Sequence, residues 1–207
     1  GNSAETSLQI WGGEGGHSTL YMYADTGDDN ADKFKISSTG GDFILGSYST
    51  GSWVTLSQMS TGGAQTMAVQ PAFCATPSTG QNDIAVNSEV TIQFGTERFD
   101  QGSNFASNTF TAPATGKYQL NASIRLDNID TAASYVELRL ITSNETYDSL
   151  IFDPDAFDTD PVYWNLSLSV LADMDTSDTA KCVMYIVGGS AQSDVQTTSY
   201  FSGFLAC

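Results

Sequence analysis

The sequence predicts an all-β protein, and three observations lead to that prediction. No stretch of about 11 or more residues repeats apolar side chains at helical spacing without interruption by Gly, Pro or a cluster of Asp, Ser and Thr. Short segments instead alternate between apolar and polar residues, the period of a strand with one buried face. Turn-rich connectors separate these segments at fairly even intervals. Such a pattern is typical of a sandwich or jelly roll.

The first part of the chain, residues 1–60, predicts a small N-terminal β module. Gly-rich turns at 12–16, 26–32 and 38–41 separate its very short strands. We expect these strands at Leu8–Trp11, Thr19–Tyr23, Lys33–Ile36, Asp42–Leu45 and Trp53–Leu56. An all-β piece of this length buries little surface by itself, so we expect another chain or domain to stabilise it.

A run rich in Ser, Thr and Gly then predicts a linker at 61–67, followed by a larger domain at 68–207. Its clearest strand is Gly116–Asp127, in which Tyr118, Leu120 and every second residue after them share one apolar face. The same alternation predicts strands at Val136–Ile141, Trp164–Val170, Cys182–Val187 and Tyr200–Ala206, with Trp164 and the following Leu and Val residues facing inward.

The charge balance limits the partners that the chain can have. There are 24 Asp and Glu residues against 7 Lys and Arg, a formal net charge of -17. A field of this sign repels phosphates, so we expect no nucleic acid partner. No window approaches the roughly 18 apolar residues of a membrane span, and we expect no membrane insertion. The chain begins without Met, from which we expect a fragment or a processed product.

The residues that carry most enzyme chemistry are scarce. The only histidine, His17, lies in a Gly-rich turn, and no Gly-x-Ser-x-Gly motif accompanies it, which excludes a Ser-His-Asp triad. Carboxylates are plentiful, but nothing indicates the desolvated acid that a glycosidase needs. We therefore expect no enzymatic activity. Cys74, Cys182 and Cys207 are odd in number, so at least one thiol is free or pairs between chains.

Residues 68–207 resemble the globular head of complement component one, subcomponent q, a jelly roll shared with tumour-necrosis-factor-like proteins. The resemblance rests on Pro71-Ala72-Phe73, on Phe99-Asp100, on Phe110 to Tyr118 (FTAPATGKY) and on Ser199 to Leu205 (SYFSGFL). Within these segments we expect six residues to be structural: Phe110, Gly116, Tyr118, Phe201, Gly203 and Phe204. The chain departs from the family at Leu120 and Ala122, where an aromatic residue is common. The resemblance implies a homotrimer whose threefold axis is lined by aromatic and aliphatic residues of one sheet.

The aromatic content fits an interface between subunits. The chain has 11 Phe, 9 Tyr and 3 Trp, more aromatic surface than one lean sandwich readily buries. The alternative is that these side chains fill the core of the monomer.

Residues 1–60 resemble modules that recur in tail fibres and other virion structural proteins of bacteriophages. The similarity is carried by Leu8 to Gly16 (LQIWGGEGG), by Ala24-Asp25 and by Gly27 to Phe34 (GDDNADKF). It implies that other virion proteins contact the chain through its N-terminal side.

Strand direction predicts where the acidic residues gather. If the stem enters one end of the jelly roll, loops 127–134, 153–161 and 188–198 lie at the far end. The candidate receptor-binding residues there are Asp127, Asn128, Asp130, Asp153, Asp155, Asp158, Asp160 and Asp194. Converging carboxylates repel one another unless a cation or a basic receptor neutralises them, and calcium at Asp153, Asp155, Asp158 and Asp160 is one candidate. The alternative is a solvated acidic surface.

These observations favour a trimeric bacteriophage virion protein, the distal receptor-binding head of a tail fibre. It would adhere to a bacterial surface receptor, a glycan or a protein, through several weak sites acting together. One alternative is a secreted ligand or lectin of the complement or necrosis-factor type. Another is a glycan-cleaving tailspike or a capsid-decoration protein. The absence of a signal segment, the unpaired cysteines and the phage-like first module favour the virion over secretion.

Overall fold

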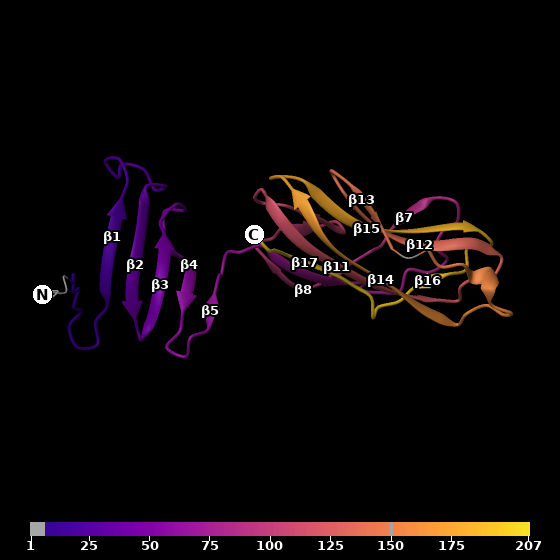
Figure 1. Cartoon of the computed structure of the whole chain (residues 1–207), viewed down its shortest axis with the longest axis horizontal. Coiled ribbons are helices and arrows are strands. Elements are labelled where there is room, and N and C mark those ends of the chain that lie inside the picture. The colour runs from indigo at the N-terminus through magenta and orange to yellow at the C-terminus, as the bar shows by residue number, and fades with distance from the viewer. Residues whose placement is uncertain (1–6, 150) are drawn as a thin grey trace, which may run out of the picture. The chain divides into compact units, whose positions relative to one another are not determined.

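The computed structural model describes residues 7–149 and 151–207. The chain divides into two compact units, one ending at Gln70 and one formed by Pro71–Cys207. We call them the N-terminal module and the head. Both consist of strands, and the only helix in the described residues is one 3-10 turn, η1 (Pro154–Ala156), so the predicted all-β class is confirmed (Figure 1). The described part of the chain contains no helix long and apolar enough to cross a membrane.

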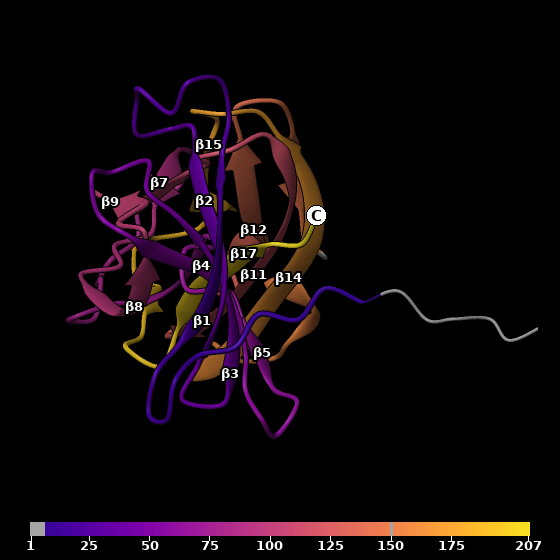
Figure 2. The same cartoon turned by 90° about the vertical axis from the view of Figure 1, so that its left-hand side faces the viewer.

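The N-terminal module is one antiparallel meander. Its strands follow chain order: β1 (Ser18–Tyr23), β2 (Lys33–Thr39), β3 (Asp42–Ser47), β4 (Val54–Met59) and β5 (Gln65–Thr66). Figure 2 shows this sheet edge on, as a single layer. Gly40 and Gly41 both have positive φ angles, 61° and 94°, which a two-residue turn between β2 and β3 requires.

Two predictions for the N-terminal module were wrong. Leu8–Trp11 is not a strand. The expected linker at 61–67 contains β5, because Gly63 donates its backbone N–H to the carbonyl of Ser60 (2.9 Å) and turns the chain back. Gln65 then pairs with Met59, and the Ser, Thr and Gly run is a hairpin turn.

The head is a jelly-roll sandwich of two antiparallel sheets, as predicted. Sheet I has the order β14-β11-β17-β6-β8 with β16 beside β11, and sheet II has the order β13-β12-β15-β10-β9 with β7 beside β15. Neighbours are mostly distant in sequence, as crossovers between the two sheets require. The strands of sheet I are β6 (Ala72–Thr76), β8 (Thr96–Gln101), β11 (Gly116–Asp127), β14 (Tyr163–Met174), β16 (Asp194–Val195) and β17 (Tyr200–Leu205). Those of sheet II are β7 (Glu89–Thr91), β9 (Phe105–Ala106), β10 (Thr109–Thr111), β12 (Ala133–Thr142), β13 (Thr146–Asp148) and β15 (Thr179–Gly188).

The core between the sheets is aromatic at its centre. The Phe73 ring stacks on the rings of Phe105 and Phe110, with centroids 5.0 and 4.7 Å apart, and meets Phe201 edge on at 4.9 Å. Tyr118 is fully buried beside Phe110. The predicted bounds of β11 and its inward face are confirmed, since Tyr118, Leu120 and each second residue to Leu126 are buried.

Glycine is required at two of the predicted structural positions. A Cβ at Gly203 would lie 2.6 Å from Leu120 Cδ2 and 2.9 Å from Phe73 Cε1. A Cβ at Gly116 would lie 2.6 Å from Leu205 Cδ1 and 2.7 Å from the backbone oxygen of Cys207. Both contacts are shorter than packed atoms tolerate, so these glycines let β17 approach the core and β11.

Two of the aromatic residues singled out in the sequence are partly exposed. Phe204 is 47% exposed, because Phe201 and Gly203 occupy the inward positions of β17 and Phe204 points the other way. Trp164 lies on the inward face as predicted, since it pairs with the buried Leu126, but at the end of β14 it is 39% exposed and its ring stacks on Phe152 at 4.6 Å.

Candidate functional site

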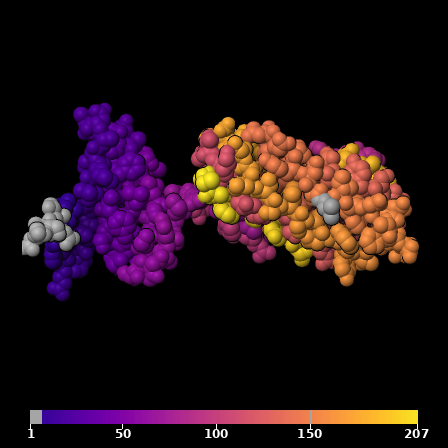
Figure 3. Space-filling model, viewed as in Figure 1, coloured from indigo at the N-terminus to yellow at the C-terminus, as the bar shows by residue number. Residues whose placement is uncertain are grey.

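Three loops meet at one end of the head, and this loop end is the candidate functional site. Lys117, at the start of β11, donates its backbone N–H to the carbonyl of Cys207 (2.7 Å), and Leu205 donates to Pro71 (3.0 Å). The chain therefore enters and leaves the head at the end where β11 starts. The loops after Asp127 lie at the opposite end of the head from the C-terminus (Figure 1), and Figure 3 shows the C-terminal residues in yellow at one end of the head and orange residues at the other.

Asp194 joins two of the loops through its carboxylate. Oδ2 accepts a hydrogen bond from Asn128 Nδ2 (2.9 Å), and Oδ1 accepts one from the backbone N–H of Asp83 (2.9 Å). Asn128 and Asp83 have positive φ angles of 57° and 54°, a conformation that Asn and Asp tolerate better than most residues. The loop that contains Asp83 thus becomes part of the site.

Asp160, in the loop at 153–161, is held by residues of the loops at 127–134 and 188–198. Its Oδ1 accepts hydrogen bonds from the backbone N–H and the hydroxyl of Thr131 (2.9 and 2.7 Å), and its Oδ2 accepts one from Gln192 Nε2 (2.9 Å). These donors, the Thr131 backbone first, hold the pKa of Asp160 below its ordinary value. Asp160 is therefore an ionised carboxylate at neutral pH.

Two of the predicted binding residues have structural roles. Asp130 is 9% exposed and accepts hydrogen bonds from the backbone N–H groups of Ala132 (2.8 Å) and Ser190 (2.6 Å), which fixes one loop to another. Asp127 forms an ion pair with Arg125, with 2.8 Å between Oδ1 and Nε. Neither residue lines the pocket at this end of the head.

A pocket of about 420 Å³ opens between the loops. Its lining residues are Asp83, Asn128, Asp160, Pro161, Val162, Gln192 and Asp194. None of the ion pairs in the described part of the chain involves its three carboxylates. The pocket is therefore acidic and suits hydrogen-bond donors or cationic groups.

Asp83 was missed by the sequence prediction. Its place in the site depends on the bridge between Gln81 and Val195, and on the hydrogen bond from Ile84 to Ser193 (2.8 Å). These partners are more than one hundred positions apart in the chain. No local pattern indicates such a pairing.

The remaining predicted acids lie on and beside η1. Asp153 caps this turn by accepting a hydrogen bond from the backbone N–H of Asp155 (3.1 Å). Three aromatic rings, Phe152, Phe157 and Trp164, pack against one another below it and anchor the segment. No described hydrogen bond joins Asp153, Asp155 or Asp158 to the acidic pocket.

The predicted calcium set of Asp153, Asp155, Asp158 and Asp160 is not assembled. Within residues 7–149 and 151–207, no three Asp, Glu, His or Cys side chains lie close enough together to hold a metal ion. The reason is that Asp160 turns toward Thr131 and Gln192 while Asp153 caps η1. The spacing of acids along the chain did not bring them together in space.

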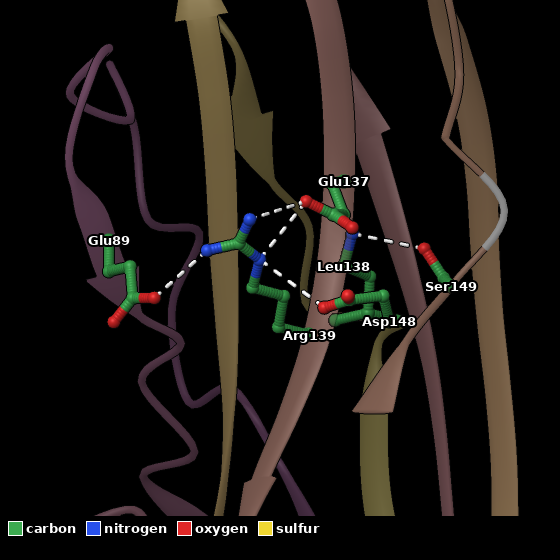
Figure 4. Close-up of polar contacts among 6 residues, drawn as sticks. All are labelled: Glu89, Glu137, Leu138, Arg139, Asp148 and Ser149. Atoms are coloured by element: carbon green, nitrogen blue, oxygen red, sulfur yellow. Dashed lines mark hydrogen bonds and ion pairs between the residues drawn. The ribbon is translucent and has the colours of Figure 1, made fainter. Parts of the chain in front are cut away.

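A separate charged cluster lies on β12, away from the loop end. Arg139 contacts three carboxylates: Glu137 at 2.8 Å, Glu89 at 3.0 Å and Asp148 at 3.4 Å (Figure 4). The Arg139 guanidinium also lies over the Tyr185 ring, 4.2 Å from its centroid. Because the cation is fully engaged, this cluster ties β7, β12 and β13 of sheet II together.

The three cysteines are all free thiols. Cys182 is buried, Cys74 is partly buried and Cys207 is exposed. Burial raises the pKa of Cys182 far above its ordinary value and also raises the pKa of Cys74. Neither has the lowered pKa of a catalytic nucleophile.

Comparison with known proteins finds similarity only among solved structures. No protein-family model matches the chain, and none of the curated proteins matches it. The globular domain of zebrafish complement 1qA protein is 14% identical, and the match covers 67% of this chain and 98% of that domain with a TM-score of 0.49. Murine APRIL is 10% identical, with 66% of this chain and 98% of that one covered and a TM-score of 0.46.

Proposed function

We propose that the protein is a non-catalytic adhesin that forms a homotrimer and binds a surface receptor with the loop end of its head. Its setting would be the distal part of a bacteriophage tail fibre, with other virion proteins contacting the N-terminal side and a bacterial surface molecule as receptor. The observation that carries the proposal is the acidic pocket, which side chains from separate loops build at the end of the head opposite Pro71 and Cys207.

The outer face of sheet I supports self-association of the head. Its central rows are uncharged, and their polar side chains bond to one another: Ser169 Oγ donates to Asn121 Oδ1 (2.8 Å), and Ser167 Oγ donates to Asn165 Oδ1 (2.9 Å). A polar network that satisfies itself can be buried at an interface without leaving unpaired groups. Exposed apolar side chains flank it: Phe99, Leu171, Tyr200 and Phe204.

On β11 and β14, the charged side chains of this face lie toward its two ends. Lys117 pairs with Asp173 at one end (2.5 Å), and Arg125 pairs with Asp127 at the other (2.8 Å). On a chain with a net charge of -17, an uncharged surface is where identical copies meet with the least repulsion.

The N-terminal module gives a second reason for assembly. Within residues 7–70 no hydrophobic side chain is buried. One face of the sheet is nevertheless apolar along three rows of cross-strand neighbours, and none of its side chains is charged: Leu20, Met22, Phe34, Ile36, Phe43, Leu45, Val54 and Met59 with intervening Ser. A sheet with such a face must bury it against another element. The same face on the other copies of the homotrimer is the occupant that we propose.

The carboxylates of the pocket support receptor binding without catalysis. A general acid needs a raised pKa to hold its proton at neutral pH, whereas the pKa of Asp160 is lowered. The pocket can instead accept hydrogen bonds or pair with cationic groups of a receptor. Weak binding at each of three copies would add up to firm adhesion.

A secreted trimeric ligand is the second candidate function. The head favours it, because Pro71–Cys207 forms a complete unit with its own core, independent of the N-terminal module. The three free thiols favour the virion instead, since secreted domains commonly pair their cysteines.

Adhesion to cells tests the proposed function. Labelled full-length protein is incubated with a panel of bacterial strains, and an adhering strain is then used to compare variants. Asp83→Asn removes a pocket carboxylate while keeping a residue that tolerates the positive φ angle. We expect it to weaken adhesion severalfold without changing the melting temperature. Glu97→Gln, on exposed β8, removes the same charge and should leave adhesion unchanged.

Two outcomes contradict the proposal. Adhesion of Asp83→Asn equal to that of the unaltered protein would remove the pocket from the binding site. Shortened polysaccharide chains after incubation with the protein would show an enzyme, because an adhesin leaves its receptor intact.

A further inference from the structure

Four aromatic rings and two lysines share one face of the N-terminal sheet, opposite its apolar face. Tyr21 pairs with Lys35 and Tyr23 pairs with Lys33 across β1 and β2, and direct cross-strand partners point to the same side. Trp53 contacts the Tyr21 ring at 5.5 Å and the Tyr48 ring at 5.3 Å. Tyr21 and Tyr23 lie parallel, with an interplanar angle of 3°.

Both ammonium groups lie over these rings. Lys35 Nζ is 4.9 Å from the centroid of Trp53, and Lys33 Nζ is 5.6 Å from the centroid of Tyr48. Neither lysine takes part in an ion pair within the described residues, whereas Lys117, Arg125 and Arg139 all do. The cation–π contacts hold the two charges in place and leave them without a counter-ion.

A shallow pocket of about 460 Å³ lies among these side chains. It is lined by Tyr23, Thr26, Gly27, Lys33, Tyr48 and Trp53, and no carboxylate is among them. The chain has only 7 basic residues against 24 acidic ones, yet Lys33 lines this pocket and Lys35 lies over the ring of Trp53, one of its lining residues. These two ammonium groups are the contacts that an anion can make here, although the loop that supplies Thr26 and Gly27 also carries Asp25, Asp28, Asp29 and Asp32.

We propose that this pocket binds an acidic sugar unit of a polysaccharide, a carboxylated pyranose of the uronic acid type. The flat faces of Tyr23 and Trp53 suit the apolar C–H face of a sugar ring, and Tyr23 is 57% exposed for such contact. Lys33 and Lys35 would pair with the carboxylate, and the Thr26 hydroxyl and the Tyr hydroxyls can bond to sugar hydroxyls. This site is separate from the loop end of the head and does not rest on the proposed function.

A single-stranded nucleic acid also combines rings with negative charge, but it fits this chain less well. It carries a phosphate at every nucleotide, and the net charge of -17 opposes each of them. A polysaccharide with an isolated acidic sugar among neutral ones places a single carboxylate at the lysines and presents neutral hydroxyl groups elsewhere.

The test uses the full-length protein and three probes of matched length: oligogalacturonate, neutral dextran oligomers and oligo-dT. Binding is measured by isothermal titration calorimetry at low salt. We expect oligogalacturonate to bind, and dextran to bind at least about tenfold more weakly, because losing one charged hydrogen bond costs about tenfold in affinity. Added salt should weaken the binding of oligogalacturonate but not that of dextran.

Variants identify the site. Lys33→Gln and Lys35→Gln should each lower the affinity for oligogalacturonate about tenfold. Lys181→Gln removes the same charge from β15 of the head and should leave the affinity unchanged. Melting curves of the variants should match that of the unaltered protein, since both lysines lie on an open sheet face.

Three results would overturn the inference. They are equal binding of dextran and oligogalacturonate, tighter binding of oligo-dT, and an affinity for oligogalacturonate that Lys181→Gln lowers as much as Lys33→Gln does. Failure of all three probes to bind at millimolar concentration would overturn it as well.

Discussion

The buried carboxylate of Glu137 is neutralised by Arg139, two residues along β12, with 2.8 Å between Oε2 and Nη2 (Figure 4). The Glu137 side chain is 4% exposed, whereas that of Arg139 is 22% exposed and reaches Glu89 and Asp148 as well. Both side chains lie on the face of β12 opposite the core residues Val136, Leu138 and Leu140, where Arg139 covers the Glu137 carboxylate.

Removing the cation from this pair should be costly. We expect Arg139→Met to lower the free energy of unfolding by about 3 to 5 kcal/mol, because it leaves Glu137 buried and unpaired. The double variant with Glu137→Met should recover most of that loss. Urea denaturation measures both, and a single variant as stable as the unaltered protein would show that Glu137 is solvated.

Tyr118 should contribute to stability mainly through its ring. The ring is fully buried, and its hydroxyl donates a hydrogen bond to the carbonyl of Ala114 (2.7 Å). We expect Tyr118→Ala to cost about 3 to 5 kcal/mol and Tyr118→Phe about 1 kcal/mol, the worth of one hydrogen bond. Denaturation curves measure both free energies of unfolding. A Tyr118→Phe variant that is less stable than Tyr118→Ala would show that the ring is not the main contribution.

Asp160 should make stability depend on pH in the acid range. Its pKa is lowered in the folded chain, so its contribution is present above the ordinary value of 3.8 and is lost as the pH falls through the folded value. We expect Asp160→Asn to lower the melting temperature at pH 7 and to lose this difference at pH about 2. Asp158→Asn, in the same loop, is the control and should change little at either pH. A difference that persists in acid would mean that the Asp160 hydrogen bonds are not charge-dependent.

The three thiols should react at different rates with a thiol reagent in the native protein. Cys207 is exposed and should react first, and Cys74 should follow slowly because burial raises its pKa. Cys182 should react only after unfolding, since burial keeps it protonated and covered. Mass spectrometry of labelled peptides resolves the order. Labelling of Cys182 as fast as Cys207 would contradict the packing of β15.

The strands with regular alternation could be predicted from sequence, and those with short or mixed patterns could not. β11 runs over twelve residues with one apolar face, and its bounds were predicted without error. β5 has only two residues, Gln65 and Thr66, neither of them apolar, and its pairing depends on the turn before it. Leu8–Trp11 has alternating apolar residues but pairs with no strand in the structure, although Ile10 lines a pocket together with Ser18, Thr19 and Leu20 of the edge strand β1.

The sequence predicted where in the head the candidate site lies, but it did not predict correctly which residues line it. Strand direction alone located the loops that contain Asn128, Asp160 and Asp194, because antiparallel strands alternate in direction. It could not distinguish Asp130, which is buried in loop hydrogen bonds, from Asp160, which lines the pocket. It also missed Asp83, whose loop joins the site through long-range pairing.

The mass of the full-length chain in solution at neutral pH tests the central claim of self-assembly most directly. Sedimentation equilibrium should give three chains of 22.0 kDa each, about 66 kDa, and Asn121→Lys, in the centre of the uncharged face of sheet I, should shift it toward the monomer. A single species of 22.0 kDa for the unaltered protein at micromolar concentration would contradict the account.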